Sequence, residues 1–137
     1  MRRLFKGTSI CALAILLPCQ AWANAEFQKA EGEWTSVWEK TGSGTMTSKT
    51  TFDPSGKMDY VPGGTVYFES ADDGGHWEGY WVESSAPVRC DTKKDDSHYW
   101  GLVEFQFNES YNEFEGHWEF CGKGEIVRKW TGKRVSE

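Results

Sequence analysis

The chain has 137 residues, of which 38% are hydrophobic and 26% charged, and its formal net charge is −6. This length predicts one compact domain. After residue 25 the chain holds 19 aromatic residues but only ten Val, Leu and Ile residues. That balance excludes a long disordered tail, which would be poor in aromatic residues, and disfavours a helical bundle with aliphatic stripes. No run of eight apolar residues follows residue 25, so no membrane span is expected there.

The N-terminal segment has the pattern of a secretory signal peptide. A basic stretch at residues 1–6 precedes an apolar run at residues 10–17, and small residues suited to a signal peptidase follow. The sequence predicts a signal peptide over residues 1–25, a single domain over 26–137, and an exported protein, periplasmic or secreted. Loss of the segment removes three basic residues and no acidic one, which leaves a formal charge of −9. Nucleic acid is not expected as a partner, because phosphate backbones repel an acidic chain.

Alternation of side-chain types predicts about eight short strands after residue 26. Their ranges are 34–38, 45–52, 57–61, 65–70, 76–83, 99–107, 113–121 and 125–134. Turns rich in Gly, Pro and Asp separate most of them, which favours hairpins and antiparallel pairing. The sequence therefore predicts an all-β fold, an antiparallel up-and-down meander that closes into a small barrel. A β-sandwich is the alternative.

Two cysteines, Cys90 and Cys121, follow residue 25. An even number of cysteines in an exported domain predicts a disulfide bond between them. Cys90 lies in the one long, charged connection, at residues 84–97. If the expected strands 99–107 and 113–121 form a hairpin, Tyr99 lies opposite Cys121. The disulfide bond would then tie the long loop to that end of the sheet. Two distant thiols are too few ligands for zinc, so neither a metal nor a cofactor is predicted.

Three strands repeat one pattern, aromatic-x-Gly-x-(Trp or Arg), centred on Gly79, Gly116 and Gly132. Positions two apart share a strand face, so each glycine leaves a notch that a ring from the neighbouring strand can cover. We interpret the repeat first as a packing device. The alternative is a row of ring-stacking subsites, and the candidate ligand-binding residues are then Trp77, Tyr80, Trp81, Trp100 and Trp118.

Both ends of the predicted domain resemble the calycin signature that avidins and lipocalins share. Gly32-Glu33-Trp34 opens the first strand, a Gly-Ser-x-x-Met run follows at residues 42–46, and the last strand ends at Arg134. The resemblance implies an eight-stranded barrel in which Trp34 seals one end and Arg134, or less well Arg128, caps its ring. It also implies that a ligand enters at the other end, near the loop of Cys90. The chain further resembles small exported bacterial β proteins with Trp-x-Gly-x-Arg strands, whose function is generally unassigned.

No catalytic motif is found in the chain. A nucleophile elbow, a P-loop and a His-Glu-x-x-His motif are all missing from the sequence. Glu115, His117 and Glu119 share a strand face and could perform acid–base chemistry, but alternating charges on an outward face are more often solvated. The long loop holds a second set of polar residues that could bind a divalent cation: Asp91, Asp95, Asp96 and His98. Such carboxylates are typical of an exposed loop, so no catalytic residue and no metal ligand is predicted.

These observations leave three hypotheses for the function. The first is an exported, non-catalytic barrel that binds a small apolar or ring-bearing molecule in a cavity lined by aromatic rings. The alternative is a carbohydrate-binding or cell-envelope interaction module, in which Trp and Tyr rings form an exposed platform for a glycan. The third is a small barrel enzyme that uses Glu115, His117 or the loop carboxylates. The direction in which the tryptophans point discriminates between them.

Overall fold

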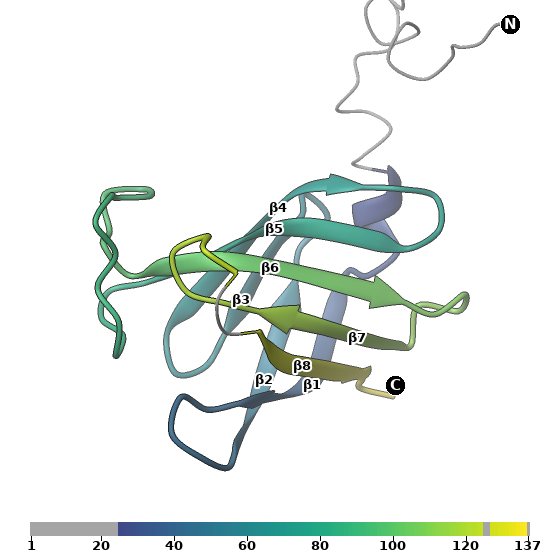
Figure 1. Cartoon of the computed structure of the whole chain (residues 1–137). Helices are drawn as coiled ribbons and strands as arrows, with labels where there is room; N and C mark the ends of the chain where they lie inside the picture. The colour runs from purple at the N-terminus through teal and green to yellow at the C-terminus, as the bar shows by residue number, and fades with distance from the viewer. Residues whose placement is uncertain (1–24, 125–126, 137) are drawn as a thin grey trace, which may run out of the picture.

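The computed structural model describes residues 25–124 and 127–136, and the predicted signal peptide up to residue 24 lies outside them (Figure 1). A short helical turn at residues 25–28 precedes eight strands. Their bounds are β1 (Gly32–Glu39), β2 (Thr45–Phe52), β3 (Lys57–Tyr60), β4 (Gly64–Ala71), β5 (His76–Glu83), β6 (Trp100–Phe107), β7 (Glu113–Trp118) and β8 (Arg128–Arg134). No helix among the described residues is long and apolar enough to cross a membrane.

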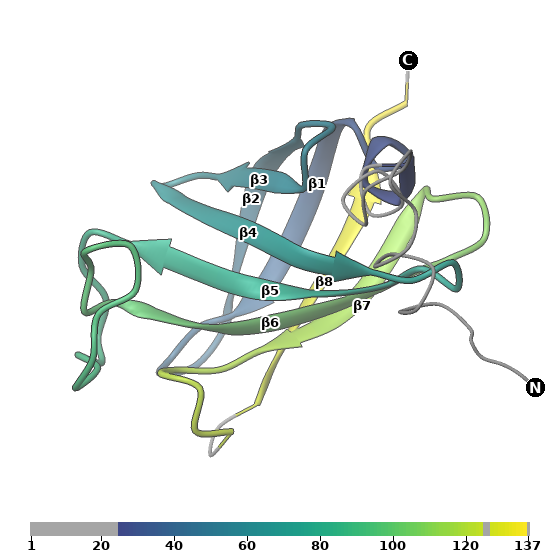
Figure 2. The ribbon, with the colours of Figure 1, turned by 90° about the horizontal axis from the view of Figure 1, so that it is seen from above.

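The eight strands form one closed barrel in the order of the sequence. Each strand pairs antiparallel with the next, and β8 returns to pair with β1, where Arg134 lies opposite Trp34 and Trp130 lies opposite Trp38. Figure 2 shows β1 and β8 side by side. Each of the eight described strands therefore has a hydrogen-bonded neighbour on both sides. The predicted all-β meander and barrel are therefore confirmed, and the β-sandwich alternative is excluded.

The alternation expected from the sequence decides which side chains face inward. In β6, Gly101, Val103, Phe105 and Phe107 are buried, whereas the residues between them are exposed. Because the inward positions are mostly aromatic, the interior is filled by rings that pack edge to face or stack, an arrangement that aromatic quadrupoles favour.

The hairpin between β6 and β7 differs from the prediction by one residue. Val103 pairs with Trp118, so the N–H of Cys121 donates to the carbonyl of Trp100 at 3.0 Å, and Cys121 does not lie opposite Tyr99. The connecting turn sets this register, and its Tyr111 has a φ of 55°. The strand also ends earlier than predicted, at Trp118, because the chain soon turns into the left-handed region at Cys121, where φ is 64°.

Two of the three glycine notches are covered by a ring, as the packing interpretation predicts. A Cβ atom on Gly132 would lie 2.1 Å from Cε2 of Phe114, and one on Gly116 would lie 2.6 Å from Cδ1 of Phe105. These two rings stack on each other with centroids 3.9 Å apart. At Gly79 the neighbour is the backbone of β4 instead of a ring. At these two positions the repeat therefore lets an aromatic ring in the barrel interior lie directly against a glycine of the neighbouring strand.

The predicted disulfide bond is confirmed. Cys90 and Cys121 are bonded, and their Cα atoms lie 5.4 Å apart. The backbone N–H of Cys90 also donates to the carbonyl of His98 at 2.7 Å. The bond joins the long loop between β5 and β6, which projects at the left of Figure 1, to the segment that follows β7.

Candidate functional site

One end of the barrel, which we call the closed end, is filled around Trp34. This ring is fully buried, and its Nε1 donates to the carbonyl of Ala30 at 2.9 Å. Three phenylalanines surround it with centroids 5.4 to 5.6 Å away, namely Phe52, Phe107 and Phe114. The helical turn adds Phe27 and Ala30, which are both buried. Rings from β2, β6 and β7, together with the segment before β1, thus fill this end of the barrel around Trp34.

Arg134 covers the closed end from outside. Its Cζ lies 4.8 Å from the centre of the Trp34 ring, within the range of a cation–π contact. The guanidinium group donates to three backbone carbonyls, those of Tyr111 at 2.9 Å, Glu31 at 2.8 Å and Lys29 at 2.6 Å. The last strand, the β6–β7 turn and the segment before β1 are therefore joined at one side chain.

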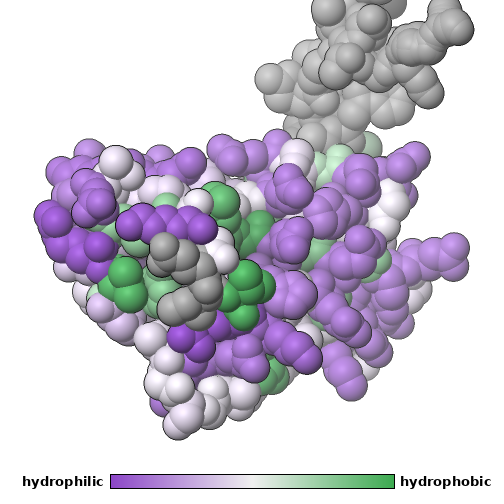
Figure 3. All heavy atoms as spheres, in the orientation of Figure 1, coloured by the Kyte–Doolittle hydropathy of each residue, from purple (hydrophilic) through white to green (hydrophobic). Residues whose placement is uncertain are grey.

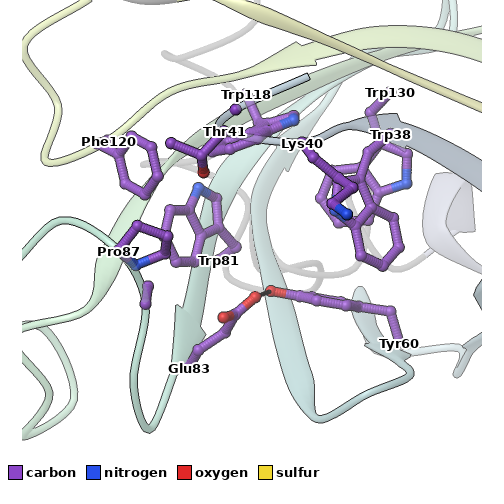
Figure 4. Close-up of a pocket in the computed structure, with 12 residues that line it drawn as sticks. Trp38, Lys40, Thr41, Tyr60, Trp81, Glu83, Pro87, Trp118, Phe120 and Trp130 are labelled. Atoms are coloured by element: carbon purple, nitrogen blue, oxygen red, sulfur yellow. Dashed lines mark hydrogen bonds between the residues drawn. The ribbon is translucent and has the colours of Figure 1, made fainter. Parts of the chain in front are cut away.

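The opposite end, which we call the open end, contains a pocket of about 240 Å³ (Figure 4). Its walls come from residues toward the ends of five strands and from three connecting segments, after β1, after β5 and after β7. The lining residues are Trp38, Lys40, Thr41, Gly42, Tyr60, Trp81, Glu83, Ala86, Pro87, Trp118, Phe120 and Trp130.

Six of these residues form two aromatic clusters, which Figure 4 shows on either side of the pocket. The first cluster has centroid distances of 5.1 to 5.4 Å and consists of Trp38, Tyr60 and Trp130. The second has centroid distances of 5.1 to 5.8 Å and consists of Trp81, Trp118 and Phe120. The slot between them offers aromatic surface on both sides, which suits a flat apolar group.

A carboxyl group lies between the two clusters. The hydroxyl of Tyr60 donates to Oε2 of Glu83 at 2.6 Å, as the dashed line in Figure 4 marks. Burial raises the pKa of Glu83, and the hydrogen bond from Tyr60 opposes that rise. Burial beside this carboxyl group also raises the pKa of Tyr60, so its hydroxyl stays protonated and remains a donor.

The long loop supplies one rim of the pocket. Ala86 and Pro87 lie on the pocket, and the hydroxyl of Ser97 fixes the loop by donating to the carbonyl of Glu83 at 2.6 Å. Phe120 lies one residue before Cys121, the second half of the disulfide bond. The bond therefore ties together two segments that line the open end.

The structure separates the five residues predicted to bind a ligand. Trp81 and Trp118 line the pocket. Trp77 lies in the closed-end core, 4.5 Å from Phe107 between ring centroids.

Tyr80 and Trp100 contact the long loop instead of the pocket. The Tyr80 hydroxyl donates to Asp95 at 2.7 Å, and Nε1 of Trp100 donates to the carbonyl of Thr92 at 2.9 Å. The ammonium group of Lys94 lies over both rings, 4.6 and 5.3 Å from their centres. These two rings hold the loop down, so only two of the five candidates meet at one site.

The pocket residues that the sequence analysis did not select include Trp38, Trp130, Tyr60 and Glu83. A signal for two of them was present. Trp38 lies four residues after Trp34, and Trp130 four residues before Arg134, so each shares a face with a residue assigned to the closed end. Four residues along an extended strand span about 13 Å, which places both rings toward the opposite end of the barrel.

The three polar residues predicted to share a strand face, Glu115, His117 and Glu119, differ in burial, and Glu119 lies just beyond the end of β7. Glu115 and His117 are exposed on the outer face. Glu119 is buried, and its carboxylate accepts the backbone N–H groups of Leu102 at 2.9 Å and Gly122 at 2.7 Å. It therefore holds the turn after β7 through backbone contacts, which assigns it a structural role.

Among the described residues, His76, Glu78 and Glu104 bring potential metal-ligand atoms within 4.8 Å of one another. Nε2 of His76 lies 3.0 Å from Glu78 and 3.6 Å from Glu104. The hydrogen bond with Glu78 raises the pKa of His76. The group lies on the outer wall, where an ion pair accounts for its geometry. Two of the loop residues considered for a cation have hydrogen-bond partners within the protein. Asp95 accepts a hydrogen bond from the Tyr80 hydroxyl, and Nδ1 of His98 donates to the carbonyl of Cys90.

No protein-family model, curated protein or solved structure matches this chain. The geometry of the two barrel ends is therefore the basis for any functional proposal.

Proposed function

We propose that this protein is an exported barrel that binds a small apolar or ring-bearing molecule in the open-end pocket and does not catalyse a reaction. The observation that carries the proposal is the slot of about 240 Å³ between two aromatic clusters. Ligand sites for drug-sized molecules span about 300–1,000 Å³, so this pocket suits a ligand of one or two rings. An eight-stranded barrel has room for one small ligand at its mouth.

We also propose a calycin-like relationship and export from the cell. The contact of Arg134 with the Trp34 ring and the pairing of β1 with β8 support the first proposal. The Cys90–Cys121 bond supports the second, because disulfide bonds persist in oxidising compartments.

The glycan-platform alternative has less support from the positions of the tryptophans. Six of the tryptophans within the described residues are buried, and Trp38 is partly buried. The large hydrophobic residues that are exposed in this part of the chain are aliphatic: Val61, Val88, Leu102, Val127 and Val135. The face in Figure 3 is mostly hydrophilic, with apolar side chains gathered in one limited area. A flat row of exposed rings, as a platform requires, is not found among the described residues.

A fluorescence titration tests the proposal, because four tryptophans line the pocket. We expect 2-phenylethanol, a neutral one-ring probe, to change the tryptophan emission with saturation. Ala86→Phe should weaken this binding by filling the pocket, since Ala86 lies on its rim. The matched control is Val88→Phe in the same loop, which adds a ring outside the pocket and should leave the titration unchanged. Equal titrations for both variants would contradict the proposed site.

A further inference from the structure

The lining of the open-end pocket is chemically uneven. Nearly all of it is aromatic or small, and three of its residues carry an ionisable group: Lys40, Tyr60 and Glu83. Tyr60 is committed to Glu83 through its hydroxyl. Glu83 is thus the acidic group against which a ligand in the slot would be placed.

Glu83 is held in position from several sides. Its Oε2 accepts the Tyr60 hydroxyl, its backbone N–H donates to the carbonyl of Tyr99 at 3.0 Å, and its own carbonyl accepts from Ser97. A carboxyl oxygen accepts more than one hydrogen bond, and Oε1 makes none within the described residues. The carboxyl group can therefore accept from a ligand without losing Tyr60.

The surrounding rings favour the same kind of ligand group. The faces of Trp and Tyr rings attract cations, and the slot presents such rings on both sides of Glu83. The net negative charge of the chain also favours a cationic ligand, because it raises the local concentration of cations. A ligand carboxylate would instead meet a like charge at Glu83 and a poor surface on the rings.

We infer that the open-end pocket prefers a ring-bearing amine, whose ammonium group binds Glu83 while its ring lies between the two aromatic clusters. This inference rests on the proposed function. Lys40 is the one cationic residue of the lining, and it is exposed in the turn after β1. Water and salt screen its charge more strongly than that of the half-buried Glu83. Lys40 therefore lowers the preference without reversing it.

A pair of probes of similar shape tests the charge preference, namely 2-phenylethylamine and 2-phenylethanol at neutral pH, followed by tryptophan fluorescence and calorimetry. We expect the amine to bind about tenfold more tightly than the alcohol, which corresponds to about 1.4 kcal/mol. Glu83→Gln should bring the two affinities together by weakening the amine alone. The control is Glu69→Gln, which removes the same charge from an exposed position on β4 and should keep the preference.

The outcomes separate the two proposals. If the alcohol binds as tightly as the amine, the amine inference is wrong and the proposed pocket stands. The same holds if Glu83→Gln still binds the amine more tightly than the alcohol. If Glu69→Gln abolishes the preference as well, net charge and not Glu83 causes it, and the inference is again wrong. If neither probe binds at millimolar concentration, the proposed function fails and takes the inference with it. Retained 2-phenylethanol binding in Glu83→Gln shows that this variant is folded and that its pocket is intact.

Discussion

The two ends of the barrel use the same pair of residue types with different results. At each end an arginine of β8 lies over a tryptophan, Arg134 over Trp34 at 4.8 Å and Arg128 over Trp118 at 5.9 Å. Arg134 has three backbone carbonyls as acceptors, whereas Nε of Arg128 has no hydrogen-bond partner among the described residues. The guanidinium group of Arg134 therefore has hydrogen-bond acceptors that the Nε of Arg128 lacks.

The segments beside the two tryptophans explain the difference. The helical turn before β1 brings Phe27 and Ala30 over the closed end and fills it. At the open end the adjacent segments are loops, and two aromatic clusters face each other across a pocket of about 240 Å³. A filled end stabilises the fold, and a hollow aromatic end leaves surface that a ligand can bury. One end of the barrel is therefore filled by packed rings, whereas the other keeps a pocket, and it is there that we propose a ligand binds.

Removal of the disulfide bond should have the largest effect and should act on the open end. A bond that spans 31 residues contributes about 3–4 kcal/mol on the chain-entropy model. We expect Cys90→Ala with Cys121→Ala to lose about that much free energy of unfolding in urea melts and to weaken 2-phenylethanol binding. Labelling of both thiols in denatured, non-reduced wild-type protein would show that the bond is missing.

Gly116→Val should disrupt the packing between the closed-end core and the open-end aromatic clusters. Gly116 pairs with Phe105 on one side and Trp130 on the other, so the notch lies where the closed-end core meets the open-end clusters. A Cβ atom there would lie 2.1 Å from the carbonyl oxygen of Glu104, and we expect a loss of about 3 kcal/mol from overpacking. Gly42→Ala is the control, because a Cβ at Gly42 meets nothing within 4 Å. A melt of Gly116→Val within about 0.5 kcal/mol of wild type would mean that the notch is not packed.

Replacement of Arg134 by alanine should lower the free energy of unfolding more than replacement of Arg128. We expect Arg134→Ala to cost about 2 kcal/mol, because it removes a cation–π contact and hydrogen bonds to three carbonyls. Arg128→Ala should cost less than about 1 kcal/mol, because its contact with Trp118 is longer and less satisfied. Urea melts of both variants, with a double-mutant cycle between Arg134→Ala and Trp34→Leu, measure this. A coupling energy of zero would contradict the closed-end contact.

The closed end was largely predictable from the sequence, and the open end was not. Gly32 and Trp34 open the first strand, Arg134 ends the last, and closure of a regular meander brings such positions together. Tyr60 and Glu83 lie 23 residues apart on strands that are not neighbours, β3 and β5. Their contact depends on the curvature of the barrel and on the loops at its mouth. Neither follows from alternation along a strand.

The candidate ligand residues show the same limit. The repeat around Gly79 and Gly116 includes Trp77, Trp81 and Trp118, whose rings lie in the core, but it did not tell at which end each ring lies. Trp77 and Trp81 flank the same glycine, and the strand carries the first into the closed-end core and the second to the pocket. Strand length and register decide this, and both are properties of the assembled sheet.

The most direct test of the account is fluorine NMR on protein labelled with 5-fluorotryptophan, titrated with 2-phenylethanol. The account predicts that the resonances of the four pocket tryptophans, Trp38, Trp81, Trp118 and Trp130, shift on binding. The resonances of Trp34 and Trp77 in the closed-end core should stay in place. Assignment by single Trp→Phe variants identifies each signal. Shifts confined to Trp34 and Trp77, or equal shifts at both ends, would contradict the claim that the barrel binds its ligand at the open end.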